Sequence, residues 1–159
     1  RTIDELRALR AGAGHDWLDR LIMEHNGIPV AASADYEKLF QMFQMKRFDY
    51  FPRGVNEVYA EISARKGSFP DMEVESSIAL YYPFPVYFFV SRKNTALAAR
   101  LEKGLRAAIA DGSFDRLFYL YNGSWIKKAA LDRRRIFRLE NTLLPASVPL
   151  QDRDLWLAP

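Results

Sequence analysis

The sequence predicts an α/β fold built from βα units around a central, mainly parallel sheet flanked by helices. Up to about Gly67, short apolar runs alternate with stretches of helical spacing, and Gly, Pro, Ser, Asn or Asp marks each change. The run of residues 82–90 is so continuously apolar that both of its faces should be covered, as in a parallel or central strand. A length of 159 residues suffices for one domain or for two small lobes.

The first βα unit is expected within residues 6–25. Residues 6–13 read as a strand that ends in a Gly-Ala-Gly turn, and residues 15–25 place apolar side chains on one helical face. Asn26 and Gly27 then close the helix. The second unit begins with a strand at residues 28–32, and its helix is capped by Ser33 or Asp35.

The third unit has a short strand at residues 48–52 and a helix after Gly54 that Gly67 stops. Residues 72–80 look extended. Asn94 or Thr95 opens a long helix, and Ser113 caps another. Residues 139–159 contain three prolines and are interpreted as an extended wrapping segment.

Composition narrows the classes of function. The 23 Lys and Arg residues exceed the 20 Asp and Glu residues by only three, so nucleic acid is not an expected partner. The chain has no cysteine, and its two histidines, His15 and His25, lack metal-ligand spacing. We therefore expect no metal and no cofactor. A late group of basic residues is interpreted as a solvated face or a docking patch: Lys127, Lys128, Arg133, Arg134, Arg135 and Arg138.

The first candidate site is the turn around Gly12, Gly14 and His15. Two glycines let a backbone approach a ligand closely, and free amide groups at the start of a helix attract a carboxylate. The alternative is that this turn only packs tightly. A third glycine is missing for a dinucleotide fingerprint, and no Gly-Lys-Ser/Thr follows for a P-loop.

The second candidate is Arg53 with Gly54, which follow the third predicted strand. Ligands collect at the carboxyl edge of an open α/β sheet. The guanidinium of Arg53 offers a fork for a carboxylate or a phosphate. Its alternative is a surface arginine between a strand and a helix. Both candidates follow strands, so they can share one crevice.

Several stretches, taken in order, resemble the periplasmic solute-binding proteins of the amino-acid type, which deliver ligands to ABC importers. Residues 9–14 are similar to the family's strand and turn, and residues 34–40 with 46–50 to its helix and Arg-x-Asp strand. The most specific match begins with Pro-Val-Tyr-Phe-Phe-Val-Ser at residues 85–91. It continues through the helix at residues 97–109 into Asp-Gly-Ser-Phe-Asp at residues 111–115.

The resemblance implies a type 2 periplasmic-binding fold, with ligand held between two lobes. Residues 1–84 would form lobe two, residues 85–138 an incomplete lobe one, and residues 139–159 a tail. Carried over by position, Arg10, Gly12, Gly14 and His15 hold a ligand carboxylate, and Arg53 with Gly54 contact its other end. The resemblance also implies a periplasmic location and a membrane permease as partner.

Two departures from the family pattern shape the expectations. The family's ammonium-binding aspartate falls at Gly54, so we expect an anionic or carboxylate-bearing ligand rather than a plain amino acid. No segment corresponds to the start of lobe one, so the apolar strand would lack sheet neighbours. We expect a fragment of a longer protein, or an oligomer that shares this strand.

Two other functions stay open on the sequence. One is a ligand-sensing domain of a signalling receptor or regulator with the same fold. The other is an enzyme, for which only His15, Asp16 and Arg53 are placed to act. The leading hypothesis is that the chain is a ligand-binding protein without catalytic activity.

Overall fold

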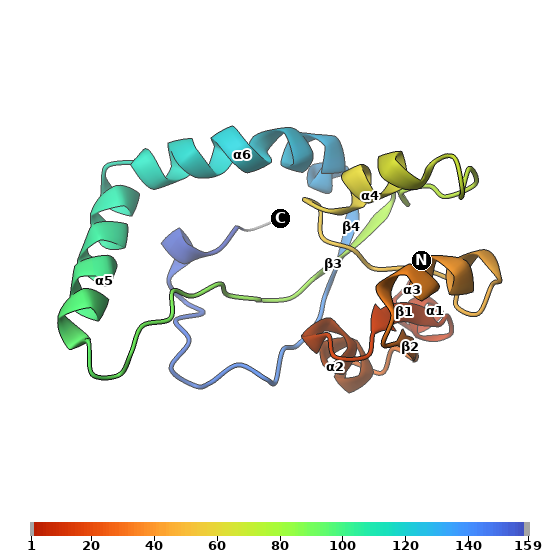
Figure 1. The fold of residues 1–159 in the computed structure, drawn as a ribbon, viewed down its shortest axis with the longest axis horizontal. Helices are drawn as coiled ribbons and strands as arrows, with labels where there is room; N and C mark the ends of the chain where they lie inside the picture. The colour runs from red at the N-terminus through yellow and green to blue at the C-terminus, as the bar shows by residue number, and fades with distance from the viewer. Residues whose placement is uncertain (1, 158–159) are drawn as a thin grey trace.

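The computed structural model describes residues 2–157 and has a mixed α/β fold with parallel strands. Residues 2–81 fold into a body that we call the lobe, and residues 82–130 form an arm that projects from it (Figure 1). The lobe contains α1 (Ile3–Arg7), β1 (Ala11–Gly14), α2 (Leu18–His25), β2 (Val30–Ser33), α3 (Tyr36–Gln44), α4 (Val58–Arg65) and β3 (Ile78–Tyr81). The rest of the chain contains α5 (Thr95–Ala110), α6 (Ser113–Ala129), η1 (Leu131–Arg133), β4 (Arg135–Arg138) and η2 (Arg153–Leu155).

Strand β1 lies at the centre of the lobe. It pairs in parallel with β2, with Ala11 opposite Val30 and Gly14 opposite Ser33. On its other side the amide of Gly12 donates to the carbonyl of Tyr50 at 2.9 Å. The predicted third strand is thus reduced to one parallel bridge at Tyr50, next to β1.

All four residues of β1 are Ala or Gly, and all are buried. A Cβ atom added at Gly12 would lie 2.3 Å from the ring of Phe48, and one at Gly14 would lie 2.3 Å from the indole of Trp17. Aromatic rings therefore occupy the space that side chains of β1 would fill. Both glycines are required by packing in this structure.

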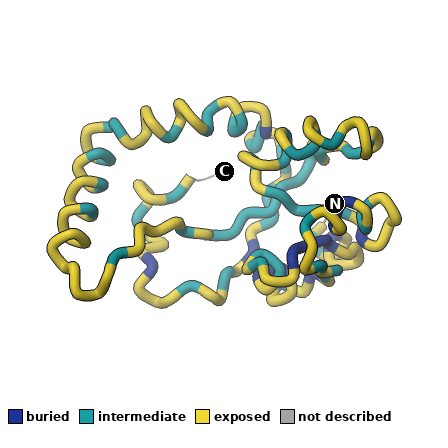
Figure 2. Tube along the Cα trace, viewed as in Figure 1, coloured by how far each residue is buried: buried dark blue, intermediate teal, exposed yellow. Residues whose placement is uncertain are grey.

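Helices α2 and α3 cover the β1–β2 sheet, and their apolar faces follow the predicted spacing. Ile22, Met23, Leu39 and Phe40 are almost completely buried. The carboxylate of Asp35 accepts hydrogen bonds from the first-turn amides of α3, so the predicted cap is confirmed. Figure 2 shows that the buried residues gather in the lobe, whereas most of the arm is exposed.

Two boundaries at the start of the chain differ from the sequence prediction. Residues 3–7 form a helix rather than the first part of a strand, because Thr2 and Glu5 make a reciprocal capping box. Of the strand predicted at residues 6–13, only residues 11–13 are extended in a sheet, and β1 ends one residue later. The predicted cap at Ser113 is also wrong: Gly112, with φ of 72°, precedes α6, and Ser113 is its first residue.

A second parallel pair, which the sequence analysis missed, joins β3 to β4. Ile78 lies opposite Arg135 and Tyr81 opposite Arg138. Part of the late basic group is used in this contact: Arg134 donates to the carbonyl of Ile78 at 3.0 Å, and Arg138 lies 4.9 Å from the ring centre of Tyr81. Both side chains thus contact β3, although Arg138 remains exposed to solvent.

The arm begins where residues 82–94 leave the lobe. The sequence predicts a strand at residues 82–90 with both faces covered, and this expectation is wrong. No strand forms between β3 and α5, and Val86 and Phe89 are 94% and 91% exposed. No other described segment pairs with these residues, so neither edge of the segment gains a sheet neighbour.

The tail after β4 runs past the lobe and back toward the arm without an α-helix or a strand, apart from the short η2 (Figure 1). Asn26 holds its start through paired hydrogen bonds with the backbone of Glu140 at 2.8 and 2.9 Å. Asp152 holds its end through an ion pair of 2.7 Å with Arg106 on α5. The tail therefore joins lobe and arm.

The aromatic packing on β1 predicts that Gly14→Ala lowers the free energy of unfolding by about 1–3 kcal/mol, because the new methyl group collides with Trp17. The matched control is Gly104→Ala, at an exposed position inside α5 with no neighbouring atom within 4 Å. That change should raise the free energy of unfolding by about 0.5–1 kcal/mol. Thermal unfolding followed by circular dichroism measures both, and equal stabilities for Gly14→Ala and the wild type would contradict the packing.

Candidate functional site

The candidate site lies where β1, β2 and the bridge at Tyr50 end, at the carboxyl edge of the parallel sheet. The chain turns from β1 into α2 at His15, whose amide donates to the carbonyl of Ser33 at 2.8 Å. Trp17 caps α2 after β1, Tyr36 begins α3 after β2, and Phe51 and Arg53 follow the bridge at Tyr50. Their proximity is the meeting of strand ends expected of an open α/β sheet.

The guanidinium of Arg53 sits inside an aromatic cage. Its central carbon lies 4.6 Å from the ring centre of Trp17, 5.5 Å from that of Phe51 and 5.6 Å from that of Tyr36. The rings of Trp17 and Phe51 stack nearly parallel at 6.2 Å. Only 12% of the Arg53 side chain is exposed, so a desolvated cation benefits from the negative faces of these rings.

Two carboxylates of α4 and its N-cap neutralise this cation. Nε and Nη2 of Arg53 donate to the two oxygens of Glu61 at 2.8 and 2.6 Å. Glu57 lies 3.2 Å from Nη2, and the hydroxyl of Tyr36 donates to Glu61 at 2.6 Å. The sequence indicated Arg53 but not these partners, although their spacing of four and eight residues from Arg53 could have pointed to them.

The proton equilibria follow from this arrangement. Burial opposes the charge of Glu61, but the hydrogen bonds from Arg53 and Tyr36 outweigh it and hold the pKa of Glu61 below its usual 4.5. Burial also opposes the charge of Arg53, while Glu61 and Glu57 raise its pKa above the ordinary value. Burial, followed by the bond to Glu61, raises the pKa of Tyr36 to about 12.

The start of α2 presents a second polar feature at this edge. Trp17 is the N-cap residue, and in the described part of the chain its side chain makes no cap hydrogen bond to the first turn. His15 and Asp16 pair through Nδ1 and Oδ1 at 2.7 Å and are both well exposed to solvent. This turn can offer amide donors and an imidazole to an anion.

The predicted site residues do not all lie together. His15, Arg53 and Gly54 lie at the carboxyl edge, whereas Gly12 and Gly14 lie buried beneath Phe48 and Trp17, which corresponds to the tight-packing alternative. Arg10 precedes β1 and so lies at the opposite edge of the sheet. A strand rises about 3.3 Å per residue, so the four residues of β1 separate Arg10 from His15.

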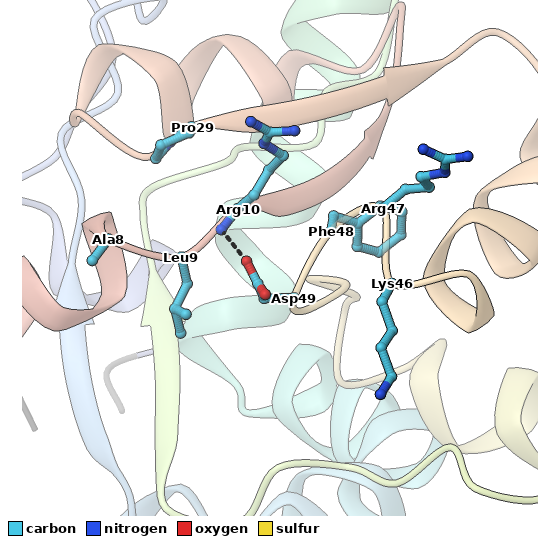
Figure 3. Close-up of a pocket in the computed structure, with 8 residues that line it drawn as sticks. All are labelled: Ala8, Leu9, Arg10, Pro29, Lys46, Arg47, Phe48 and Asp49. Carbon is cyan, nitrogen blue, oxygen red and sulfur yellow. Dashed lines mark hydrogen bonds between the residues drawn. The ribbon is translucent and has the colours of Figure 1, made fainter.

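Arg10 instead lines a cavity of about 270 Å³ at the amino end of β1 (Figure 3). Its backbone amide donates to a carboxylate oxygen of Asp49 at 2.7 Å. In Figure 3 the side chain of Lys46 extends away from those of Arg10 and Arg47, and Lys46 and Arg47 follow the C-terminus of α3. Cations suit a helix C-terminus, so this hollow does not assemble a convergent anion site.

A junction between lobe and arm adjoins α2. The hydroxyl of Tyr82 donates to a carboxylate oxygen of Asp19, in the first turn of α2, at 2.5 Å. Burial, together with this bond, raises the pKa of Tyr82 well above its usual value. Nearby, a cavity of about 150 Å³ lies between lobe, arm and tail, lined by Leu18, Phe84, Pro85, Tyr87, Asn141, Leu143 and Leu144.

No family of known sequences, no curated protein and no solved structure matches this chain. Within residues 2–157, no group of three or more acidic, histidine or cysteine side chains is arranged to hold a metal ion. None of the helices in that range has the length and apolar character needed to span a bilayer.

The buried ion pair predicts that Glu61→Gln lowers the free energy of unfolding by about 2–4 kcal/mol at pH 7, because Arg53 is left without its bidentate partner. The folded-state pKa of Glu61 lies below its unfolded value. The stabilisation is therefore complete above about pH 4.5 and is lost as the pH falls through the folded-state pKa. Urea unfolding at pH 7 and near pH 3 should show the difference between wild type and variant shrinking at the lower pH.

The control for this prediction is Glu24→Gln, which removes the more exposed partner of Arg20 on α2. Exposed pairs contribute little, so the expected loss is about 0.5 kcal/mol or less. Equal losses for the two variants would show that the Arg53–Glu61 pair is no more important than a surface pair.

Proposed function

We propose that this chain is an extracytoplasmic solute-binding protein of an ABC-type importer, or part of one, with a type 2 periplasmic-binding fold. The lobe binds a small carboxylate-bearing or amino-acid-like molecule in a cleft shared with a second lobe, to which the arm belongs. The protein works in the periplasm and delivers its ligand to a membrane permease.

The observation that carries this proposal is the paired crossing between lobe and arm. The parallel strands β3 and β4 lie side by side, and each leads into an extended segment that leaves the lobe (Figure 1). Beyond the strands the two segments stay linked, because the side-chain amide nitrogen Nδ2 of Asn141 donates to the backbone carbonyl of Pro83 at 2.8 Å. Two adjacent extended connections suit hinge motion between two bodies.

The chemistry of the carboxyl edge supports an anionic group on the ligand. His15, the uncapped start of α2, Arg53 and the amide of Gly54 are all donors at this edge. Binding without catalysis is the better proposal, because the candidate acid–base pair of His15 and Asp16 is mostly exposed to solvent rather than enclosed in a pocket.

A contact surface on the arm belongs to the proposal as well. The segment of residues 84–89 and the helix α6 expose large apolar side chains, among them Val86, Phe89, Leu120 and Tyr121. Such an area requires a covering chain. We propose that either the remainder of a longer polypeptide or a second copy covers it.

The exposed segment predicts that the chain as given binds a hydrophobic dye and associates as its concentration rises. The double variant Val86→Asp and Phe89→Asp should reduce both effects several-fold, because charge on both exposed positions opposes burial against another chain. Light scattering and dye fluorescence measure the outcome. A chain that stays monomeric at both low and high concentration and binds no dye would contradict the proposed surface.

The proposed ligand class predicts that small carboxylates raise the melting temperature in a thermal-shift screen of mono- and dicarboxylic acids, amino acids and polyamines. His15→Ala should weaken binding of a stabilising carboxylate about 5- to 10-fold, because one donor is lost. His25→Ala, at the far end of α2, is the matched control and should leave the affinity unchanged. Stabilisation by cationic or neutral amino acids alone would overturn the proposal.

A further inference from the structure

Arg53 has two edges that can each bind a carboxylate with two hydrogen bonds. Glu61 takes the side edge, formed by Nε and Nη2, in a complete fork. The end edge, formed by Nη1 and Nη2, is only half used, because Glu57 approaches Nη2 at 3.2 Å and Nη1 has no partner among the described residues.

Glu57 and Glu61 also differ in how firmly they are held. The side chain of Glu61 is 15% exposed and accepts a further bond from Tyr36, whereas that of Glu57 is 45% exposed. Displacing Glu57 therefore moves a carboxylate into water, at little cost. Displacing Glu61 would leave a carboxylate without its partner in a desolvated site. Glu57 is the partner that another anion can replace.

One oxygen of Glu57 gathers two donors at this position. Oε2 accepts from the backbone amide of Gly54 at 3.1 Å and lies 3.2 Å from Nη2 of Arg53. A carboxylate from a ligand in the same place would meet the same amide and the same guanidinium edge, and could also reach the unused Nη1. The side chain of Glu57 thus has the position and the chemistry of an anionic ligand.

We propose that Glu57 is a built-in competitor, which occupies the anion site of Arg53 and Gly54 until a ligand carboxylate replaces it. This inference rests on the proposed function and adds a residue that sets affinity. Glu57 lowers the affinity for weak monocarboxylates and favours ligands whose other contacts make up for its displacement.

The test is a titration of the wild-type chain and of Glu57→Gln with sodium acetate at constant ionic strength. The indole N–H signal of Trp17 reports occupancy, because this ring lies against Arg53. Glu57→Gln removes the competing charge and keeps an oxygen for the Gly54 amide, so its dissociation constant for acetate should fall about tenfold. In the double variant Arg53→Lys with Glu57→Gln, the gain should disappear, because lysine lacks the fork.

Asp35→Asn is the matched control for charge. It removes one negative charge from the same edge of the sheet and keeps the cap of α3, since asparagine also caps helices. Its acetate affinity should stay within about twofold of the wild type. If Glu57→Gln does not fold, Glu57→Ser removes the same charge and suits the N-cap position of α4.

The outcomes separate the two proposals. Equal acetate affinities for wild type and Glu57→Gln overturn the competitor and leave the proposed function intact. An equal gain in Asp35→Asn also overturns it, because the effect is then one of net charge. If the acetate signal is absent from both proteins and the carboxylate screen is negative, the proposed function itself fails.

Discussion

The absence of side-chain volume on β1 is the constraint on which the rest of the lobe depends. Only Ala and Gly occupy the central strand, so Phe48 and Trp17 can lie directly against its backbone. The stacking of Phe51 on Trp17 extends this aromatic layer to the carboxyl edge. Arg53 can then be desolvated at this edge, because its guanidinium lies over the indole ring of Trp17.

Desolvating that arginine determines the electrostatics of α4. A buried cation is stable only with well-placed partners, and Glu61 and Tyr36 supply them in a connected set of hydrogen bonds. The same set attaches α4 to the sheet edge, since α4 contributes no fully buried side chain of its own. Charge pairing thus does for α4 what apolar burial does for α2 and α3.

Local signals predicted the α/β class and most of the helices. The caps at Asp35 and Asn94 and the apolar spacing of α2 and α3 are visible in the sequence, because short-range contacts produce them. Residues 82–90 read as a buried strand, yet an apolar sequence does not show whether a partner strand exists. Strand β4 was not predicted because Arg135 and Arg138, its two exposed end residues, make half of this four-residue strand charged.

The sequence predicted which sheet edge carries the candidate site, but not which side chains pair with Arg53 there. Strand ends indicated Arg53 and His15, whereas the identity of the anion beside Arg53 depended on where α4 turns back. Arg10 was grouped with His15 by position in the family resemblance, yet a strand places its two ends at opposite edges. A positional match along an extended segment is therefore poor evidence for a shared site.

The junction at Tyr82 couples the two ends of this architecture. Its hydroxyl is bonded to Asp19, one turn from the residues that face the carboxyl edge, and its backbone continues directly into the exposed arm. A movement of the arm must either carry the first turn of α2 with it or break a buried hydrogen bond, which is costly in a desolvated place. The position of the arm and the geometry of the anion site are for this reason not independent.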